Sequence, residues 1–346
     1  MIDIMLRKIS LALLFCFAVF VSKAQQEIYE AYSVLNLRSS ARVANIGMDF
    51  LPWQVNDVSV AITNPTILSK EMNNQFAVGY TDLFAGIWQG NVAYSHTFNK
   101  IGSLSFGLNY IGYGKFQRTL PNGDQVGEFT ANDYMFTIGW GRMLDSNIYI
   151  GANLKPIFSQ YEDYSSIALA FDVAATYISD EKSFMATLMA RNFGTQLKTF
   201  NNIEEKLPFQ LELGVSKKLK HAPLQLFAMV THLQKWDLRE NDPLNPRDEI
   251  DPFTNEIKRE NHFLGTLDNM FRHLNVGVNF ELSKSFYLAF GYSWKQSREM
   301  YLQDAFSMSG FSYGFGINIK RFQLSYARNE YHKYGSPNHL TLLVRL

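Results

Sequence analysis

Hydrophobic residues alternate with small or polar residues through residues 311–329, FSYGFGINIKRFQLSYARN. Aromatic and aliphatic side chains occupy every second position, and glycine, serine and asparagine fill most of the positions between them. A period of two predicts β-strands with one apolar face and one small or polar face. Lys320 and Arg321 interrupt the pattern and predict a two-residue turn, which places Ile319 opposite Phe322 on the apolar face.

The same alternation recurs from about residue 75 to the last residue, and it predicts fourteen strands. Many of these strands exceed the roughly five or six residues usual in soluble sheets, and they match the roughly 9–11 residues with which a tilted strand crosses a membrane. The predicted strands cover residues 75–82, 87–98, 101–112, 131–142, 147–160, 164–178, 182–193, 208–218, 222–235, 272–283, 286–297, 310–320, 321–333 and 338–346.

The connections between these strands differ in length according to their order along the chain. Those after the second, fourth, sixth, eighth, tenth and twelfth strands are short, whereas long loops occupy residues 113–130, 194–207, 236–271 and 298–309. Short turns at one end and long loops at the other are typical of a bacterial outer-membrane barrel. A soluble periplasmic β-protein has no reason to sort its loops in this way. The expected fold is therefore all-β, a single transmembrane antiparallel β-barrel of about fourteen strands.

A barrel in a membrane directs its apolar side chains outward. Because a closed barrel satisfies its backbone polar groups within the hydrocarbon, the leucine, phenylalanine and isoleucine rows are expected to face lipid. Glycine, serine, asparagine and scattered charges then face the lumen. The charged residues at alternate positions of apolar strands form either a neutralising network of wall pairs or a transport path. They are Lys155, Asp172, Arg191, Glu212 and Glu281.

The first 24 residues predict export from the cytoplasm. Two basic residues precede an apolar run at residues 9–21, and Ser-Lys-Ala follows, which is the pattern of a signal peptide. The run is too short to cross a bilayer of roughly 30 Å as a helix. Cys16 is the single cysteine, and bulky Phe15 precedes it where a lipoprotein signal needs a small residue. The mature chain is expected to begin near Gln25 and to contain no disulfide.

Composition and charge narrow the class of protein further. Thirty-two basic residues balance thirty-two acidic ones, so nothing indicates binding to nucleic acid. Beyond the signal peptide no apolar run approaches 18 residues, so no transmembrane helix is expected. The expected location is the outer membrane of a Gram-negative bacterium, with the short turns in the periplasm and the long loops facing the cell exterior.

Residues 25–72 do not follow the strand pattern and precede the barrel expected at residues 73–346. A segment of this length either plugs the lumen or closes its periplasmic mouth. Asp57 can accept a hydrogen bond from its own backbone, and the pair Asn64-Pro65 favours the start of a turn. These three residues are expected to be a structural motif.

The loop at residues 236–265, WDLRENDPLNPRDEIDPFTNEIKRENHFLG, is rich in charge and proline. It is a solvated loop, a partner-docking surface or an ion site, although it lacks the spacing of an EF-hand. Loops of this length are uncommon unless they are functional or disordered. The residues expected to contact a partner are Trp236, Asp237, Arg239, Asp242, Arg247, Asp251, Phe253 and Lys258.

The sequence offers little for catalysis. It contains no G-x-S-x-G, no H-E-x-x-H and no Walker A sequence, and its seven histidines show no ligand spacing within a turn. We therefore expect no enzyme, no catalytic residues, no cofactor and no metal.

The stretch SARVANIGMDF through NDVSVAITNPTIL (residues 40–68) resembles the opening of FadL-type outer-membrane barrels. The remainder is similar to one branch, the PorQ family of the type IX secretion system in Bacteroidetes. Segments that carry this likeness include YSVLNLRSSAR, GANLKPIFSQYEDYSS, RNFGTQLKTF, LPFQLELGVSKKLKHAPLQL and FRHLNVGVNFELSKSFYLAFGY, in order along the chain.

The PorQ resemblance implies a non-enzymatic barrel that anchors the attachment complex. In that complex a PorZ-like surface protein docks on the barrel beside PorU and PorV, and secreted cargo is joined to surface lipopolysaccharide. The implied partners are those proteins together with outer-membrane lipid. The broader FadL resemblance implies a different function, the transport of hydrophobic small molecules through a lateral opening or past a plug.

Overall fold

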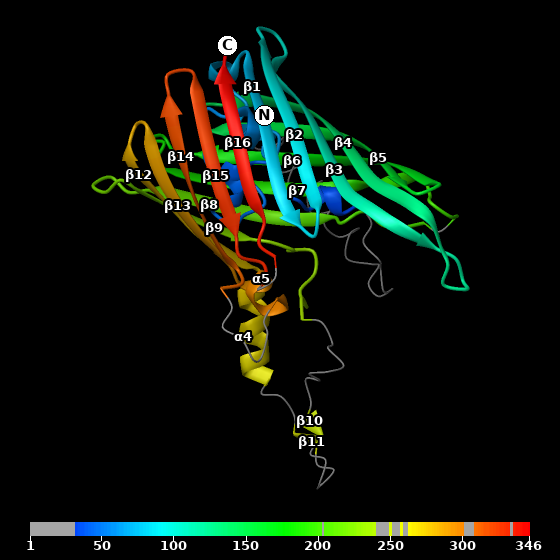
Figure 1. Ribbon diagram of the computed structural model, residues 1–346. Coiled ribbons are helices and arrows are strands. Elements are labelled where there is room, and N and C mark those ends of the chain that lie inside the picture. Colours follow the sequence, from blue (N-terminus) through cyan, green and yellow to red (C-terminus); the bar gives the residue numbers. More distant parts are fainter. Residues whose placement is uncertain are drawn as a thin grey trace, which may run out of the picture.

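The computed structural model describes residues 32–202, 204–239, 249–250, 257–258, 262–300, 308–332 and 335–346. The expected signal peptide lies outside these residues. The fold is a closed antiparallel barrel of fourteen strands in which each strand pairs with its neighbours in sequence and β1 pairs with β16 (Figure 1). The strands are β1 Gln75–Phe84, β2 Ile87–Phe98, β3 Gly102–Thr119, β4 Gln125–Asp145, β5 Ile148–Tyr161, β6 Tyr164–Ile178, β7 Phe184–Lys198, β8 Gln210–Lys218, β9 Leu224–Val230, β12 Leu274–Ser283, β13 Phe286–Ser293, β14 Phe311–Ile319, β15 Phe322–Asn329 and β16 Asn338–Arg345.

Five short helical turns precede the barrel, and two helices follow β9 and β13. The short turns are η1 Ser33–Leu35, α2 Ala41–Ala44, α3 Val58–Ala61, η2 Pro65–Ile67 and η3 Lys70–Met72, and the later helices are α4 His262–Arg272 and α5 Trp294–Glu299. A two-stranded ribbon, β10 Glu249–Ile250 with β11 Ile257–Lys258, belongs to the connection before α4. Within the described residues, no helix is long and apolar enough to cross a membrane.

The strand prediction is confirmed in number, order and direction. In β14, Ser312, Gly314 and Gly316 are buried, whereas Phe311 and Ile319 are 47 % and 62 % exposed, so the apolar row faces outward and the small row faces the lumen. The turn at Lys320 has a left-handed backbone, with φ of 54°, and it pairs Ile319 with Phe322 as expected. The short connections also lie together at one end, named here the short-turn end.

The opposite end, named here the long-loop end, differs in detail from the expected loops. Residues 113–130 are mostly strand, because β3 and β4 extend as a hairpin to Thr119 and Gln125. Cross-strand contacts stabilise this extension. Lys115 pairs with Glu128 at 2.9 Å, and the rings of Phe116 and Phe129 stack at 5.3 Å.

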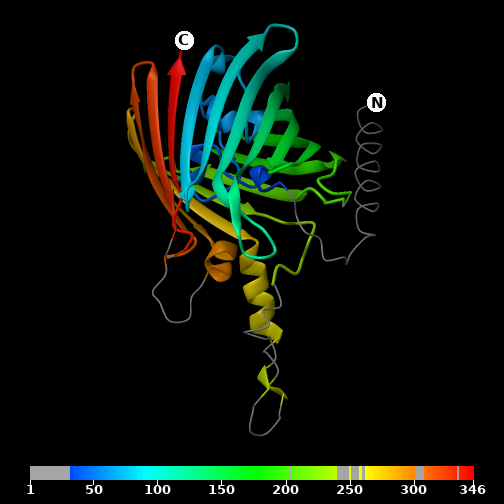
Figure 2. The same cartoon turned by 45° about the vertical axis from the view of Figure 1, so that its right-hand side comes forward.

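Two predicted strands end early at the long-loop end. The strand expected at residues 222–235 stops at Val230, and His232 adopts a left-handed backbone. The strand expected at 286–297 stops at Ser293, whose hydroxyl caps α5 by accepting from the backbone N–H of Gln296. Helices α4 and α5 extend beyond the barrel at this end (Figure 2).

Residues 32–72, named here the plug, occupy the lumen rather than closing one mouth. The main buried apolar cluster joins plug residues such as Ile46, Phe50 and Val60 to wall residues such as Met189 and Phe227. The interior of the barrel is therefore a core formed between the plug and the wall.

Candidate functional site

The plug begins at the long-loop end and leaves the lumen at the short-turn end. The Tyr32 hydroxyl is hydrogen-bonded to the Ser166 hydroxyl, close to the turn between β5 and β6. At the other end the backbone N–H of Leu346 donates to the Asn74 carbonyl at 3.1 Å. The plug thus runs the length of the barrel before the first strand starts.

Asp57, Asn64 and Pro65 lie in the second half of the plug, and all three are buried. Asp57 caps α3: its Oδ1 accepts from the backbone N–H of Ser59 at 3.0 Å. Asn64 Oδ1 accepts from the Thr66 hydroxyl at 2.7 Å, and Asn64 Nδ2 donates to the Leu51 carbonyl at 3.1 Å. Asn64 is the N-cap of η2, and Pro65 follows it in the first turn, where a missing N–H costs nothing.

Glycines in the wall admit the plug backbone. Gly141 of β4 and Gly151 of β5 are register partners, and Pro65 lies directly over both. A Cβ atom on Gly151 would lie 2.7 Å from the Pro65 carbonyl carbon, which is closer than real Cβ contacts allow. Glycine at these positions therefore determines how deeply the plug sits against the wall.

Four of the five charges expected in the lumen are buried in paired form. Lys155 Nζ lies 2.6 Å from Asp172 Oδ2, and Arg191 lies 3.4 Å from Glu212. The structure therefore shows the network of wall pairs. Glu281 differs, because it lies partly exposed at the short-turn end and pairs with Lys218.

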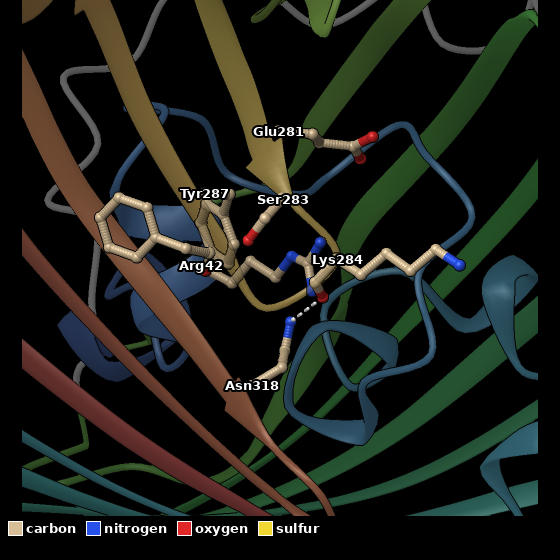
Figure 3. Close-up of a pocket in the computed structure, with 7 residues that line it drawn as sticks. Arg42, Glu281, Ser283, Lys284, Tyr287 and Asn318 are labelled. Atoms are coloured by element: carbon tan, nitrogen blue, oxygen red, sulfur yellow. Dashed lines mark hydrogen bonds between the residues drawn. The ribbon is translucent and has the colours of Figure 1, made fainter.

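A cavity of about 430 Å³ opens at the short-turn end, between the plug and strands β12, β13 and β14 (Figure 3). Arg42 of α2 reaches into it, and its guanidinium carbon lies 4.8 Å from the centroid of the Tyr287 ring. This is the geometry of a cation–π contact. The residues around the cavity are Arg42, Glu281, Ser283, Lys284, Phe286, Tyr287 and Asn318.

Sequence reasoning did not single out Arg42, Tyr287 or the cavity. The available signal was an arginine with no acidic residue between positions 31 and 48. Such an arginine has no acidic residue nearby in the sequence to pair with. An anionic partner must come from elsewhere in the fold or from a ligand.

The residues expected to dock a partner are described only in part. Trp236 is 65 % exposed and stacks on His273, with 5.6 Å between the ring centroids. Arg239 Nε lies 3.9 Å from Asp268 of α4, and Asp237 Oδ1 accepts from the Arg239 backbone N–H at 3.0 Å. Lys258 belongs to β11, and four residues lie outside the described part of the chain, namely Asp242, Arg247, Asp251 and Phe253.

Comparison with known proteins gives a fold rather than a family. No protein-family model matches the chain, and no curated protein matches it. Among solved structures, two mutants of TodX, a monoaromatic hydrocarbon channel of Pseudomonas putida, match with TM-scores of 0.54 and 0.51. Their identities are 10 % and 12 %, and each match covers 90 % of this chain and 99 % or 98 % of the mutant.

A third structure, a FadL homologue of Pseudomonas aeruginosa, matches at 10 % identity and a TM-score of 0.48 over 89 % of this chain and 98 % of the homologue. These comparisons give no support to the closer resemblance to the PorQ family. The two TodX matches demonstrate a shared architecture, and the chain has a FadL-like fold, a closed barrel of fourteen strands around its own N-terminal segment.

Proposed function

We propose that the chain is a FadL-like outer-membrane channel that passes small hydrophobic molecules. The observation that carries this proposal is a closed fourteen-stranded barrel whose lumen holds its own N-terminal segment. The TodX mutants that share this fold are monoaromatic hydrocarbon channels. A non-enzymatic role fits this likeness, because both TodX structures are channels.

The outer surface supports a position in a membrane. Toward the long-loop end, aromatic rings on four successive strands contact one another, with centroid distances of 6.1 Å for Tyr80–Trp88 and 5.0 Å for both Trp88–Tyr110 and Tyr110–Tyr134. On the short-turn side of this row the wall exposes large apolar side chains, such as Ile138 at 43 %. An aromatic row bordering an apolar band is the pattern of a barrel at a lipid–water interface.

The plug limits the routes that a molecule could take through the barrel. One route requires the plug to move. A second route passes through the wall beside β7, whose ladder with β8 ends at the pair Arg191–Gln210 although β7 continues to Lys198. Described residues that follow β7 contact this part of the strand: the Asn192 side chain donates to the Pro208 carbonyl at 3.2 Å, and the Glu205 backbone N–H donates to Gln196 Oε1 at 2.9 Å.

A disulfide between plug and wall tests the channel proposal and separates the two routes. The hydroxyls of Thr66 on the plug and Thr176 on β6 lie 2.5 Å apart, and Cys16 of the expected signal peptide is the single native cysteine. We expect the unmodified barrel in liposomes to accelerate the uptake of radiolabelled toluene. We expect the oxidised T66C/T176C variant to lose that acceleration and to regain it after reduction.

The serine variant T66S/T176S is the matched control for this experiment. If the oxidised T66C/T176C variant takes up toluene at the rate of the unmodified barrel, the molecule passes through the wall beside β7. Uptake no faster than in liposomes that carry an unrelated barrel of similar size would contradict the channel proposal.

A second candidate function is the anchor of an attachment complex, and the ordered platform at the long-loop end favours it. Helices α4 and α5 contact each other there: Arg298 Nε lies 3.0 Å from Asp268, and the rings of Phe271 and Trp294 stack at 4.7 Å. On this proposal a PorZ-like surface protein, with PorU and PorV, binds the platform, and lipopolysaccharide receives the cargo.

Affinity purification from detergent-solubilised outer membranes tests the anchor function. A surface protein recovered with the full chain and lost after deletion of residues 240–261 would support it. A folded barrel that is recovered alone would contradict it.

A further inference from the structure

The cavity at the short-turn end has the size of a small-molecule site. Its volume of about 430 Å³ lies within the roughly 300–1,000 Å³ usual for ligand pockets. Plug helix α2 contributes Arg42 to it, the turn after β12 contributes Lys284, and the end of β14 contributes Asn318. The cavity therefore lies where the plug meets the wall, at the end where the lumen opens between the short turns.

Arg42 brings a positive charge into this cavity without an acidic partner among the described residues. Its guanidinium instead lies over the face of Tyr287. The one acidic residue of the cavity, Glu281, is already paired with Lys218. The Lys284 side chain extends away from the Arg42 guanidinium (Figure 3). Arg42 is thus the cation that faces the cavity interior.

Tyr287 is a fixed platform beneath that cation. Its hydroxyl lies 3.1 Å from the Ser325 hydroxyl, and its ring fills the space that a side chain on Gly316 would occupy. A cation–π contact contributes less than a charge-assisted bond to an anion, and it leaves the edges of the guanidinium available. An incoming carboxylate can therefore bind Arg42 without displacing Tyr287.

A second set of groups lies behind Arg42 and is also unpartnered. Gln225 of β9 and Asn279 of β12 are register partners, and they are 2 % and 6 % exposed. Gln225 Nε2 and Asn279 Oδ1 have no hydrogen-bond partner among the described residues. They line a narrow continuation of the cavity that shares Arg42 and Tyr287 with it. A buried amide group without a hydrogen bond costs free energy. The two groups therefore indicate that a polar group from outside the described residues forms hydrogen bonds with them.

The continuation also carries apolar walls from the plug and from β9. Ile46, Leu51 and Val55 of the plug and Phe227 of the wall border it. Its free volume of about 10 Å³ is that of roughly one water, so the apolar lumen is closed behind Arg42. A ligand held by Arg42 would lie against this closed apolar region.

We propose that this cavity binds a small organic carboxylate, with Arg42 as the partner of its carboxylate and Tyr287 as its wall. The inference rests on the channel function proposed above and adds a second class of ligand, a carboxylate that the charge of Arg42 binds more tightly than a neutral molecule of similar shape. The Arg42 guanidinium has no acidic partner among the described residues, and its planar shape matches the two oxygens of a carboxylate. The rings of Phe286 and Tyr287 border the cavity and can contact a compact hydrocarbon body.

Binding of phenylacetate and of its neutral counterpart 2-phenylethanol tests the proposal. Isothermal titration calorimetry on the full barrel in non-ionic detergent at low salt gives both affinities. We expect the unmodified protein to prefer phenylacetate. We expect Arg42→Gln to weaken phenylacetate binding by about tenfold or more, the loss of one charge-assisted bond. Arg42→Lys keeps the charge and is expected to retain part of the preference.

Lys320→Gln is the matched control, because Lys320 is a cation of the short-turn end outside the cavity. Folding of each variant is checked by its heat-dependent shift in gel mobility. Equal affinities for the two probes in the unmodified protein would overturn the proposal, and so would a loss in Lys320→Gln as large as that in Arg42→Gln. Toluene uptake by the unmodified barrel is scored separately, so failure of the channel function is distinguishable from failure of the carboxylate site.

Discussion

Gln323 of the barrel wall donates a hydrogen bond to Asp57 of the plug, with 2.8 Å between Nε2 and Oδ2. The other oxygen of Asp57 caps α3 and also accepts from the Ser59 hydroxyl at 2.6 Å. Asp57 is only 1 % exposed. One buried carboxylate therefore fixes both the local fold of the plug and its attachment to β15.

Replacement of Asp57 by alanine is expected to destabilise the docked plug by about 1–3 kcal/mol, because it removes a helix cap and a buried charge-assisted hydrogen bond. Asp57→Asn keeps an acceptor oxygen for the cap and is expected to cost less. Hydrogen exchange of the α3 amides in the detergent-solubilised barrel measures both effects. A double-mutant cycle with Gln323→Ala isolates the contact between plug and wall, and fully additive costs would contradict a direct interaction.

The sequence predicts the wall of this barrel well, because the information is local. Strand alternation is visible wherever one face meets lipid and the other meets the lumen, as at Phe311 and Ser312. Turn positions follow from interruptions of that pattern, as at Lys320. The outward direction of the apolar row follows from the membrane environment.

The interior is not predictable in the same way, because its contacts join distant parts of the chain. The plug has no strand periodicity, and its depth depends on wall glycines such as Gly151, which no plug residue specifies. The Arg42–Tyr287 contact forms only when α2 is docked against β14, β15 and β16, which brings Arg42 over the Tyr287 ring of β13. At the long-loop end, Trp294 continues the alternation of β13 in sequence, yet the capping bond to Ser293 starts a helix there.

Gly151→Ala is expected to displace the plug while the barrel still closes. The added Cβ would lie 2.7 Å from both the Pro65 carbonyl carbon and the Thr66 backbone nitrogen, so backbone must shift. Limited trypsin digestion of the folded barrel measures this displacement as faster cleavage at Arg42 or Lys70 of the plug.

Gly90→Ala is the matched control for Gly151→Ala. A Cβ atom there would meet only the Trp88 ring, at 3.2 Å, and a side chain can rotate away. Equal protection of the plug in Gly151→Ala and in the unmodified protein would show that the contact with Pro65 does not determine the plug position.

Lys155→Met is expected to destabilise the barrel strongly, by roughly 3–5 kcal/mol, since it leaves Asp172 buried without its partner. The pair is nearly inaccessible, with Lys155 5 % and Asp172 1 % exposed. The midpoint of urea unfolding in detergent measures the loss. The double variant K155M/D172L removes both charges and is expected to recover much of the stability. A double variant less stable than Lys155→Met would contradict this account.

His232 is expected to make the long-loop end sensitive to acid. It lies in the segment after β9, outside the strands, and its Nδ1 is buried with no hydrogen-bond partner in the part of the chain that the structure describes. Burial, together with the charge of Lys295, lowers the pKa of His232 to about 4, although Asp49 opposes the shift. An unfolded histidine has a pKa of roughly 6.5. Between these values the unfolded chain binds a proton that the folded chain does not, so stability is complete above pH 6.5 and falls as the pH drops toward 4.

Histidine C2-hydrogen exchange followed by mass spectrometry measures this pKa directly, and urea unfolding at pH 7, 5.5 and 4 measures its consequence. His232→Gln cannot bind the proton and is expected to flatten the fall in stability over this range. A midpoint of exchange near 6.5 for His232 would mean that the segment after β9 is open to solvent. The contacts of that segment with α4, such as the hydrogen bond from Asn269 to the Trp236 carbonyl, would then contribute little to the platform at the long-loop end.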